Sequence, residues 1–537
     1  MKKGAKKKNS KNNSIRTLNR KELFFILGLV LLISIFANVI LSKEYLQKAP
    51  PISNVRSAGT STSVGSVKKP IPQLAGWPKQ LGGEPGSPHI IEDLDNDGIK
   101  ELIVRSDPPG LVTVLDSQGN NKPGWPIQII SGTISVGDVT GNGNKELVFV
   151  SVGKLYVYDS LGNLLPGWPS KTIATFPSVS AAALIDLNND GIKDIVYAGG
   201  SSVANPNQEL VAYNYQGNFL PGFPTRLKGS SKSTVAVGDI NLDGKNEIIV
   251  ASNFKLNQQL STIDDIYLEA FDNLGIKLWD KQIPYGFTLP PVVPASIGNL
   301  DGDSELEIVF PGYDGEIYAL NHDGSPLQGW SSVSWGANWI LSPAAIGDID
   351  EDGLNEIISY RGPYLYALEN NGAIKWSKYK FQDFNGGYVR ASPIISDITG
   401  DGKMEVLVST EGFSNSGIFA FDGGNGNLLN QFPLKGGPQL TSFQRSAPLI
   451  TDFDLDGDIE IIVGGDDGNI YVWDLTSPYN PNLTWLFLAN GLNLSLLNRF
   501  FKNFLTILLP HPLLMLIYDF VMLIKVFGDR VYSSLQS

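Results

Sequence analysis

One acidic motif recurs eight times between Asp93 and Glu460 and constrains the fold of this chain more than any other feature. Each copy follows or closely approaches the spacing D-x-[DNT]-x-[DN]-G-x-x-[DE], and an aliphatic run comes directly after it, as at Leu102–Val104. Successive copies begin 45, 48, 53, 60, 49, 49 and 55 residues apart. A drifting period of this length places the length variation in loops and is typical of four-stranded propeller blades.

The same four strands are expected around each acidic loop. In the fourth copy a small-residue strand, Thr234–Gly238, precedes the loop, and an aliphatic strand, Glu247–Ala251, follows it. Leu155–Asp159 has the alternating pattern of a half-buried third strand. A Pro-Gly-Trp-Pro element, as at Pro123–Pro126, begins the fourth strand, and we expect its aromatic ring to pack between blades.

The two ends of the repeat array complement each other. A lone copy of the fourth strand, Gly76–Leu81, precedes the first acidic loop, whereas the eighth unit is complete only through its third strand, Ile470–Asp474. The sequence therefore predicts an all-β, eight-bladed β-propeller whose N-terminal strand closes the last blade. A seven-bladed ring is the alternative if one unit is degenerate, and residues beyond about Leu475 are expected to be unnecessary for closure.

The acidic loops have the ligand pattern of a calcium site. Oxygen ligands at positions 1, 3, 5 and 9, a backbone carbonyl at position 7 and a glycine turn at position 6 suit a hard cation of the size of Ca²⁺. Isolated loops of this kind also make plain turns, but eight in register before a strand indicate several Ca²⁺ ions. The candidate ligands are Asp93, Asp95, Asp97, Glu101, Asp138, Asn142, Glu146, Asp186, Asn188, Asp190, Asp194, Asp239, Asn241, Asp243, Glu247, Asn299, Asp301, Asp303, Glu307, Asp348, Asp350, Asp352, Glu356, Asp397, Asp401, Glu405, Asp452, Asp454, Asp456 and Glu460.

The eight loops differ in charge. Those beginning at Asp93, Asp348 and Asp452 offer four carboxylates each, whereas the loop at Asp138 offers two, helped by Thr140 and Asn142. Calcium affinity is expected to follow the number of carboxylates. In the fifth loop Asn299 stands first and Ser304 replaces the glycine, so a distorted or empty site is expected there.

Composition supports oxygen-ligand chemistry and excludes other classes. The chain has no Cys and only three His, which are scattered, so disulfides, thiolate catalysis and a Cys-based zinc site are excluded. Residues 1–48 carry eleven Lys or Arg against two Glu, which leaves the remainder of the chain with a net charge of −22. An acidic body of this kind makes nucleic acid an improbable partner. No nucleophile with its base and no open metal site is legible, so an enzyme is not predicted.

The N-terminal region predicts attachment to a membrane. A basic segment, 1–22, precedes residues 23–42, which run without a charge and are long enough to cross a bilayer as a helix. A cleavable signal peptide is the alternative, but its apolar region is usually shorter and ends in small residues. Residues 43–70 read as a flexible linker, and the propeller occupies residues 71–480. The predicted location is the cell membrane, with a single pass, a cytoplasmic N-terminus and the propeller outside.

Residues 481–537 differ from the rest of the chain. They lack acidic loops and contain an apolar stretch, Phe504–Phe527, that is long enough for a second membrane span. His511, Pro512 and Asp519 are costly near the middle of a bilayer, so an amphipathic or disordered apolar tail is an equal alternative. A third interpretation is that this tail is not the ancestral end of the domain.

The repeats resemble those of the FG-GAP or VCBS repeat proteins, whose best-known members are the N-terminal propellers of integrin alpha subunits. Close matches are GDINLDGKNEIIVAS at Gly238–Ser252 and TDFDLDGDIEIIVGG at Thr451–Gly465. The resemblance covers roughly residues 71–475 and implies a calcium-stabilised propeller used outside the cell for adhesion or ligand binding. The Phe-Gly and Gly-Ala-Pro elements that name the family are mostly absent, so integrin partners are not implied, and the chain is similar to a bacterial or archaeal surface protein of this class.

The face opposite the acidic loops is the predicted binding surface for an extracellular protein or carbohydrate. Its candidate residues are Trp335, Trp339, Tyr388, Arg390 and Arg445, although burial between blades is an alternative for each. Adhesion or ligand recognition is the favoured function. A quinoprotein-like or polysaccharide-acting enzyme is the second class, since Tyr366–Ser377 looks somewhat like a quinoprotein repeat, and an envelope assembly scaffold is the third.

Overall fold

The computed structural model describes residues 70–129, 132–151, 153–170, 180–199, 209–231, 233–254, 265–283, 293–312, 314–331, 342–361, 364–379, 388–389, 391–411, 416–437, 440, 442–443, 447–479 and 484–485. The chain divides into two units, Met1–Val67 and Lys68–Ser537, and every described residue belongs to the second. The predicted membrane spans at 23–42 and 504–527 lie outside the described residues. Among those that are described, no helix has the length and apolar character needed to cross a membrane.

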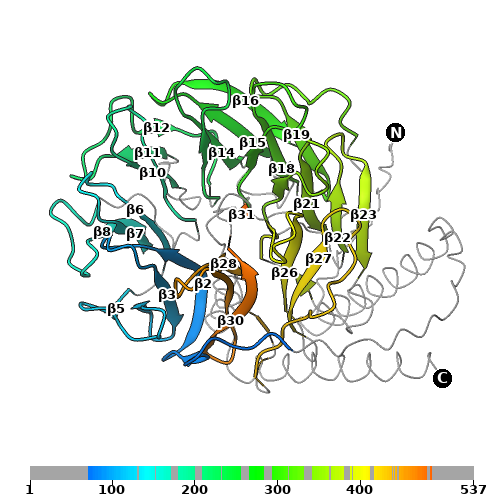
Figure 1. The fold of residues 1–537 in the computed structure, drawn as a ribbon. Coiled ribbons are helices and arrows are strands. Elements are labelled where there is room, and N and C mark those ends of the chain that lie inside the picture. Colours follow the sequence, from blue (N-terminus) through cyan, green and yellow to red (C-terminus); the bar gives the residue numbers. More distant parts are fainter. Residues whose placement is uncertain are drawn as a thin grey trace, which may run out of the picture. The chain divides into compact units, whose positions relative to one another are not determined.

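The described strands form eight antiparallel sheets around a common axis, each of which is one blade (Figure 1). From the innermost strand outward, blade 1 contains β2 (Glu84–Glu92), β3 (Glu101–Asp107), β4 (Leu111–Leu115) and β5 (Ile127–Gln128); blade 2, β6 (Thr133–Gly137), β7 (Glu146–Ser151) and β8 (Lys154–Tyr158); blade 3, β9 (Ala183–Ile185), β10 (Asp194–Gly199), β11 (Glu209–Tyr213) and β12 (Thr225–Arg226); and blade 4, β13 (Ala236–Gly238), β14 (Glu247–Phe254), β15 (Asp265–Phe271) and β16 (Lys277–Ile283).

The second half of the ring repeats this plan. Blade 5 contains β17 (Ser296–Gly298), β18 (Glu307–Pro311) and β19 (Ile317–Leu320); blade 6, β20 (Ala345–Gly347), β21 (Glu356–Arg361), β22 (Tyr364–Leu368) and β23 (Ile374–Tyr379); blade 7, β24 (Tyr388–Val389) and β25 (Ile394–Ser396), which both pair with β26 (Glu405–Glu411), then β27 (Ile418–Asp422); and blade 8, β28 (Leu449–Thr451), β29 (Asp458–Gly464), β30 (Asn469–Pro478) and β1 (Lys79–Gln80). A short strand, β31 (Thr484–Trp485), pairs with β25. The eight-bladed prediction is confirmed, and the seven-bladed alternative is excluded.

The ring closes in blade 8, where the two ends of the repeat array meet. Lys79 and Gln80 of β1 pair with Ile470 and Asn469 of β30, as the lone N-terminal strand predicted. However, β30 continues past Leu475 to Pro478, and the backbone N–H of Tyr479 donates to the carbonyl of Gly457 at 2.9 Å. The third strand expected at Ile470–Asp474 is thus longer in the structure, because its end also pairs with its own acidic loop.

Aliphatic side chains of the second strands join neighbouring blades. For example, Leu102 and Val104 of β3 share a buried cluster with Ile462 and Val472 of blade 8, and all four are fully buried. Each of the eight buried clusters in the described part of the chain combines residues of two adjacent blades. Burial of an aliphatic side chain contributes about 1.5–3 kcal/mol, so these clusters hold the ring together.

Tryptophan side chains also connect one blade to the next. The indole N–H of Trp77 donates to the carbonyl of Ser117 at 2.8 Å, and that of Trp125 to the carbonyl of Ser160 at 3.0 Å. Trp168, Trp279 and Trp376 make the same bond to the following blade, at 2.7, 2.8 and 2.6 Å. The expectation that aromatic rings of the Pro-Gly-Trp-Pro elements pack between blades is thus confirmed for the described copies.

Candidate metal centre

The acidic loops connect the first strand of each blade to the second, so all eight lie on one face of the ring. They are called loops 1 to 8 and comprise residues 93–101, 138–146, 186–194, 239–247, 299–307, 348–356, 397–405 and 452–460, with positions numbered 1 to 9 within each. Neighbouring loops are bonded directly. The N–H of Lys145 in loop 2 donates to the carbonyl of Leu94 in loop 1 at 2.8 Å, and the Asn355 amide in loop 6 donates to the carbonyl of Asn299 in loop 5 at 2.6 Å.

The backbone of the loops turns sharply at positions 4 and 6. Position 4 has a positive φ in all eight loops, and it accounts for every non-glycine residue with positive φ in the described part of the chain: Asn96, Asn189, Leu242, Glu351 and Leu455. A left-handed conformation costs an L residue roughly 1–2 kcal/mol, so the rest of the loop must impose it. Position 6 is a left-handed glycine in seven loops. Ser304 of loop 5 has no such φ, so the turn of this loop differs from the others, and the distorted or empty metal site expected there stays a prediction.

The side chain at position 1 holds this turn in place. In loop 1, Asp93 accepts the backbone N–H groups of Asp97 at 3.1 Å and Gly98 at 2.9 Å. In loop 3, Asp186 accepts those of Asp190 and Gly191 at 3.1 and 2.8 Å. These bonds use one lone pair of each carboxylate oxygen and leave others directed into the loop. These loops are therefore already shaped around their first carboxylate, whereas in loop 8 Oδ1 of Asp452 has no hydrogen-bond partner.

The carboxylate at position 9 begins the second strand and is buried in every loop. One of its oxygens accepts the backbone N–H of position 2, as Glu101 does from Leu94 at 3.0 Å and Glu356 from Ile349 at 3.0 Å. The second oxygen, Oε1, has no hydrogen-bond partner in Glu356 and Glu460, and in Glu101 it meets only the Lys122 ammonium, at 2.8 Å. An unpaired buried oxygen of this kind is costly unless a cation neutralises it.

The residue at position 3 decides what the second oxygen meets. Thr140 and Asn241 donate to the Oε1 atoms of Glu146 and Glu247 at 3.1 and 3.3 Å, so loops 2 and 4 satisfy this oxygen internally. Loops 1, 5, 6 and 8 have an aspartate at position 3 instead. Among the described residues, only these four loops bring three acidic side chains together with ligand atoms within 4.8 Å of one another: Asp93, Asp95 and Glu101; Asp301, Asp303 and Glu307; Asp348, Asp350 and Glu356; and Asp452, Asp454 and Glu460.

Burial gives these carboxyl groups unusual proton affinity. It raises the pKa of Glu460 to about 8 and that of Glu356 to about 7, while the bonded backbone N–H groups act in the opposite direction. The pKa of Glu101 is raised for the same reason, and the Lys122 ammonium counteracts it. A divalent cation at these loops would favour the ionised carboxylates and release the bound protons. The donor set, with oxygens only and an unpaired buried oxygen, fits Ca²⁺.

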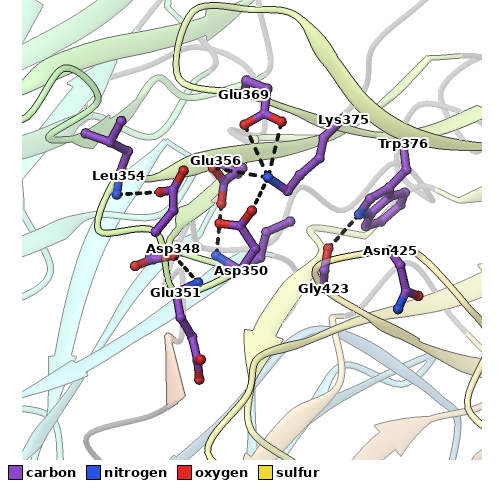
Figure 2. A network of polar contacts seen from close by, with 12 residues as sticks. Asp348, Asp350, Glu351, Leu354, Glu356, Glu369, Lys375, Trp376, Gly423 and Asn425 are labelled. Atoms are coloured by element: carbon purple, nitrogen blue, oxygen red, sulfur yellow. Dashed lines mark hydrogen bonds and ion pairs between the residues drawn. The ribbon is translucent and has the colours of Figure 1, made fainter.

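Two functional residues were not anticipated from the sequence. The Lys122 ammonium lies 2.8 Å from Oε1 of Glu101 and 3.2 Å from a carboxylate oxygen of Asp95. In loop 6 the Lys375 ammonium contacts Asp350 and lies 3.9 Å from Oε1 of Glu356 (Figure 2). Both lysines come from the segment that follows the third strand, and only their alignment between blades could have identified them.

The predicted ligand face is not defined by the described residues. Trp335, Trp339, Arg390 and Arg445 lie outside them, and Tyr388 is described only through its backbone in β24. On the axis, the innermost strands line a cavity of about 650 Å³ with mainly aliphatic walls, as at Val136, Ala183 and Ile297.

Comparison with known proteins supports both the repeat and the fold. The model of the FG-GAP-like repeat matches residues 138–197 and 186–250. Comparison with curated proteins gives no match. Among solved structures, the chain is similar to a quinohemoprotein alcohol dehydrogenase from Comamonas testosteroni, with 13% identity, 75% of this chain and 77% of that chain covered, and a TM-score of 0.50.

Two further structures are similar at lower TM-scores. The V. cholerae biofilm matrix protein Bap1 is 15% identical, with 76% of this chain and 79% of that chain covered and a TM-score of 0.34. A rhamnogalacturonan lyase from Bacillus licheniformis is 15% identical, with coverages of 78% and 94% and a TM-score of 0.40. Identities this low reflect the fold alone. The FG-GAP-like repeats matched at residues 138–250 and the eight blades together support an FG-GAP repeat propeller that resembles the N-terminal domain of integrin alpha subunits.

Proposed function

We propose that this propeller binds Ca²⁺ through its acidic loops and requires the ion for full stability. The observation that carries the proposal is in loop 8. Oε1 of Glu460 and Oδ1 of Asp452 are buried without hydrogen-bond partners, and both residues belong to a cluster of three carboxylates. A bound Ca²⁺ would be coordinated by such oxygens at about 2.3–2.6 Å and would remove the cost of burying them.

Thermal unfolding of the full-length protein in detergent tests this proposal. We expect EGTA to lower the melting temperature and added Ca²⁺ to restore it, because an ion that binds only the folded state stabilises it by mass action. Mg²⁺ at the same concentration should restore less, since it requires a smaller octahedral site. A melting temperature unaffected by EGTA, together with no retained calcium after dialysis, would contradict the proposal.

We further propose that the protein is an adhesion or recognition module held at the cell membrane by residues 23–42, with the propeller outside the cell. The acidic loops occupy one face of the ring, which leaves the opposite face for a protein or carbohydrate ligand. Protease treatment of intact cells should digest the propeller if it is exported. Binding of the purified protein to glycan arrays and surface extracts, with and without calcium, would then identify the ligand class. Capture of envelope components alone would favour a scaffold.

A further inference from the structure

One position in each blade links the outer strands to the acidic loop. In blade 1, Leu102 pairs with Leu115, Leu115 is bridged by Asn121, and Lys122 follows. In each blade, one residue of the third strand is bridged by a residue of the segment that follows it or, in blade 8, of the N-terminal segment. We call the residue directly after that bridging residue the entry position of the blade. The same count gives Lys375 in blade 6 and leucine in the six other blades: Leu165, Leu220, Leu278, Leu327, Leu429 and Leu74.

The two lysines direct their charge into the loops. The Lys122 ammonium contacts Glu101, Asp95 and, at 3.8 Å, Asp97, while 24% of its side chain is exposed. In blade 6 the Lys375 ammonium contacts Asp350, lies 3.9 Å from Oε1 of Glu356 and contacts Glu369 at 3.2 Å, as Figure 2 shows. Each ammonium therefore lies beside the Oε1 atom that has no other hydrogen-bond partner.

Other lysines near the acidic loops do not behave in this way. Lys145 pairs with Glu92, which is not a candidate ligand, at 3.7 Å, and Lys277, which precedes Leu278 at the entry position of blade 4, pairs with Glu269. Lys100 donates to Thr451. Proximity of a lysine to these acidic turns is thus not sufficient, and the contact with the ninth carboxylate depends on the entry position.

A lysine at the entry position and a calcium ion require the same oxygens. Ca²⁺ binds carboxylate oxygens at about 2.3–2.6 Å, and an ammonium donates to them at about 2.7–2.9 Å. Two positive centres on one Oε1 atom repel each other strongly in a partly buried loop. Loop 1 contains four carboxylates and loop 6 contains five, including Glu351 at position 4, so metal-free repulsion in these loops would otherwise be among the largest.

We propose that Lys122 and Lys375 are internal counter-cations that close loops 1 and 6 without metal, so that Ca²⁺ binds loop 8 before them. The inference rests on the proposed calcium function and assigns which of its sites are filled. Loop 8 has the same four candidate ligands, but its entry position is Leu74. Lys100 donates to Thr451 and acts on Asp452 and Glu460 through its charge, but none of the described ion pairs joins a lysine to Glu460. Loops 1 and 6 would then keep their structure at any calcium concentration, whereas the structure of loop 8 would depend on bound calcium.

The test replaces each lysine with the residue found in the other blades. Full-length wild type, Lys122→Leu and Lys375→Leu would be dialysed against free calcium from about 10⁻⁷ to about 10⁻³ M, which spans the affinities of protein calcium sites, and retained ions counted. We expect each variant to gain one site at least tenfold tighter than in the wild type. Lys145→Leu is the matched control, since it removes a nearby lysine that touches no candidate ligand, and it should leave the count unchanged.

The reverse exchange provides an independent measurement if a leucine variant does not fold. Leu74 stands at the entry position of blade 8, whose Glu460 has an Oε1 atom without a hydrogen-bond partner. Leu74→Lys should weaken calcium binding at loop 8 about tenfold. Lysine variants that bind calcium with the wild-type number and affinity would overturn the inference and leave the proposed function intact. A wild type that retains no calcium at any concentration would instead show that the proposed function itself is wrong.

Discussion

Loops 6 and 8 carry the same four carboxylates at the same positions, yet their ninth residues meet different surroundings. Glu356 lies beside the Lys375 ammonium, whereas Oε1 of Glu460 has no partner and its blade has Leu74 at the entry position. Burial raises the pKa of Glu460 to about 8, against about 7 for Glu356, on which Lys375 acts in the opposite direction. The number of carboxylates in a loop therefore does not by itself determine what the loop binds.

The largest expected difference concerns stability in calcium. Glu460→Gln should reduce the free energy of unfolding by about 4 kcal/mol when free calcium is a thousandfold above the dissociation constant, because that is the stabilisation one site supplies. Glu356→Gln should cost less than half as much. Urea unfolding of both variants measures this contrast, and equal losses would show that loops 6 and 8 bind calcium alike.

A second difference should appear without calcium. Lys375→Leu should destabilise the metal-free protein by about 3 kcal/mol, since it leaves Glu356 buried without its counter-charge. Adding Glu356→Gln to this variant should recover most of the loss, because the unpaired charge is then removed as well. Urea unfolding in EGTA tests both steps, and no recovery would mean that Lys375 acts only through packing.

The dependence on pH should distinguish the two loops further. The pKa of Glu460 is raised in the folded state, so the metal-free protein holds its proton more tightly than the unfolded chain does. As far as this group is concerned, the free energy of unfolding is therefore highest below about pH 4 to 5, and it should fall by on the order of 4 to 5 kcal/mol as pH rises to 8.5. Glu460→Gln should flatten this slope more than Glu356→Gln does, and calcium should abolish it in the wild type.

The smallest expected effect is in loop 5. Its three carboxylates cluster as in loops 6 and 8, but Ser304 does not adopt the left-handed conformation of position 6. Ser304→Gly should allow that conformation and tighten calcium binding by about 1 kcal/mol or less. Calorimetric titration measures the change. If binding weakens instead, the regular turn is not what loop 5 lacks.

Much of the fold could be predicted because each blade repeats its own local signals. The acidic turn before an aliphatic run located the first two strands of every blade, and the unpaired fourth strand at Gly76–Leu81 identified the closing strand. The end of β30 was harder, since Pro478 belongs to the strand only through its pairing with Asp458. That pairing depends on tertiary contacts rather than on strand pattern.

The positions of the candidate ligands could also be predicted from the sequence, but the charged groups that contact them could not. Spacing placed Asp452 and Glu460 in one loop, because they are eight residues apart in a single turn. The charge partner of Glu356 lies 19 residues further along, on a different strand, where Lys375 looks like an ordinary solvent-facing residue. Only the pairing register of the third strand shows that Lys375 occupies the position at which six other blades have a leucine.

The closing strand determines how the ring responds to tension. Force applied through the N-terminal segment would reach the propeller at Pro72, whose carbonyl accepts the N–H of Asp474, and then at Leu74, which donates to Val472. Beyond these bonds, β1 pairs with β30, and the Trp77 indole attaches the segment to blade 1. Pulled from that end, the outer edge of blade 8 would peel away one bond at a time and the ring would open there first. In a propeller tethered by its N-terminus, blade 8 would thus be the first blade to unfold under force, and it contains the loop expected to bind calcium most tightly.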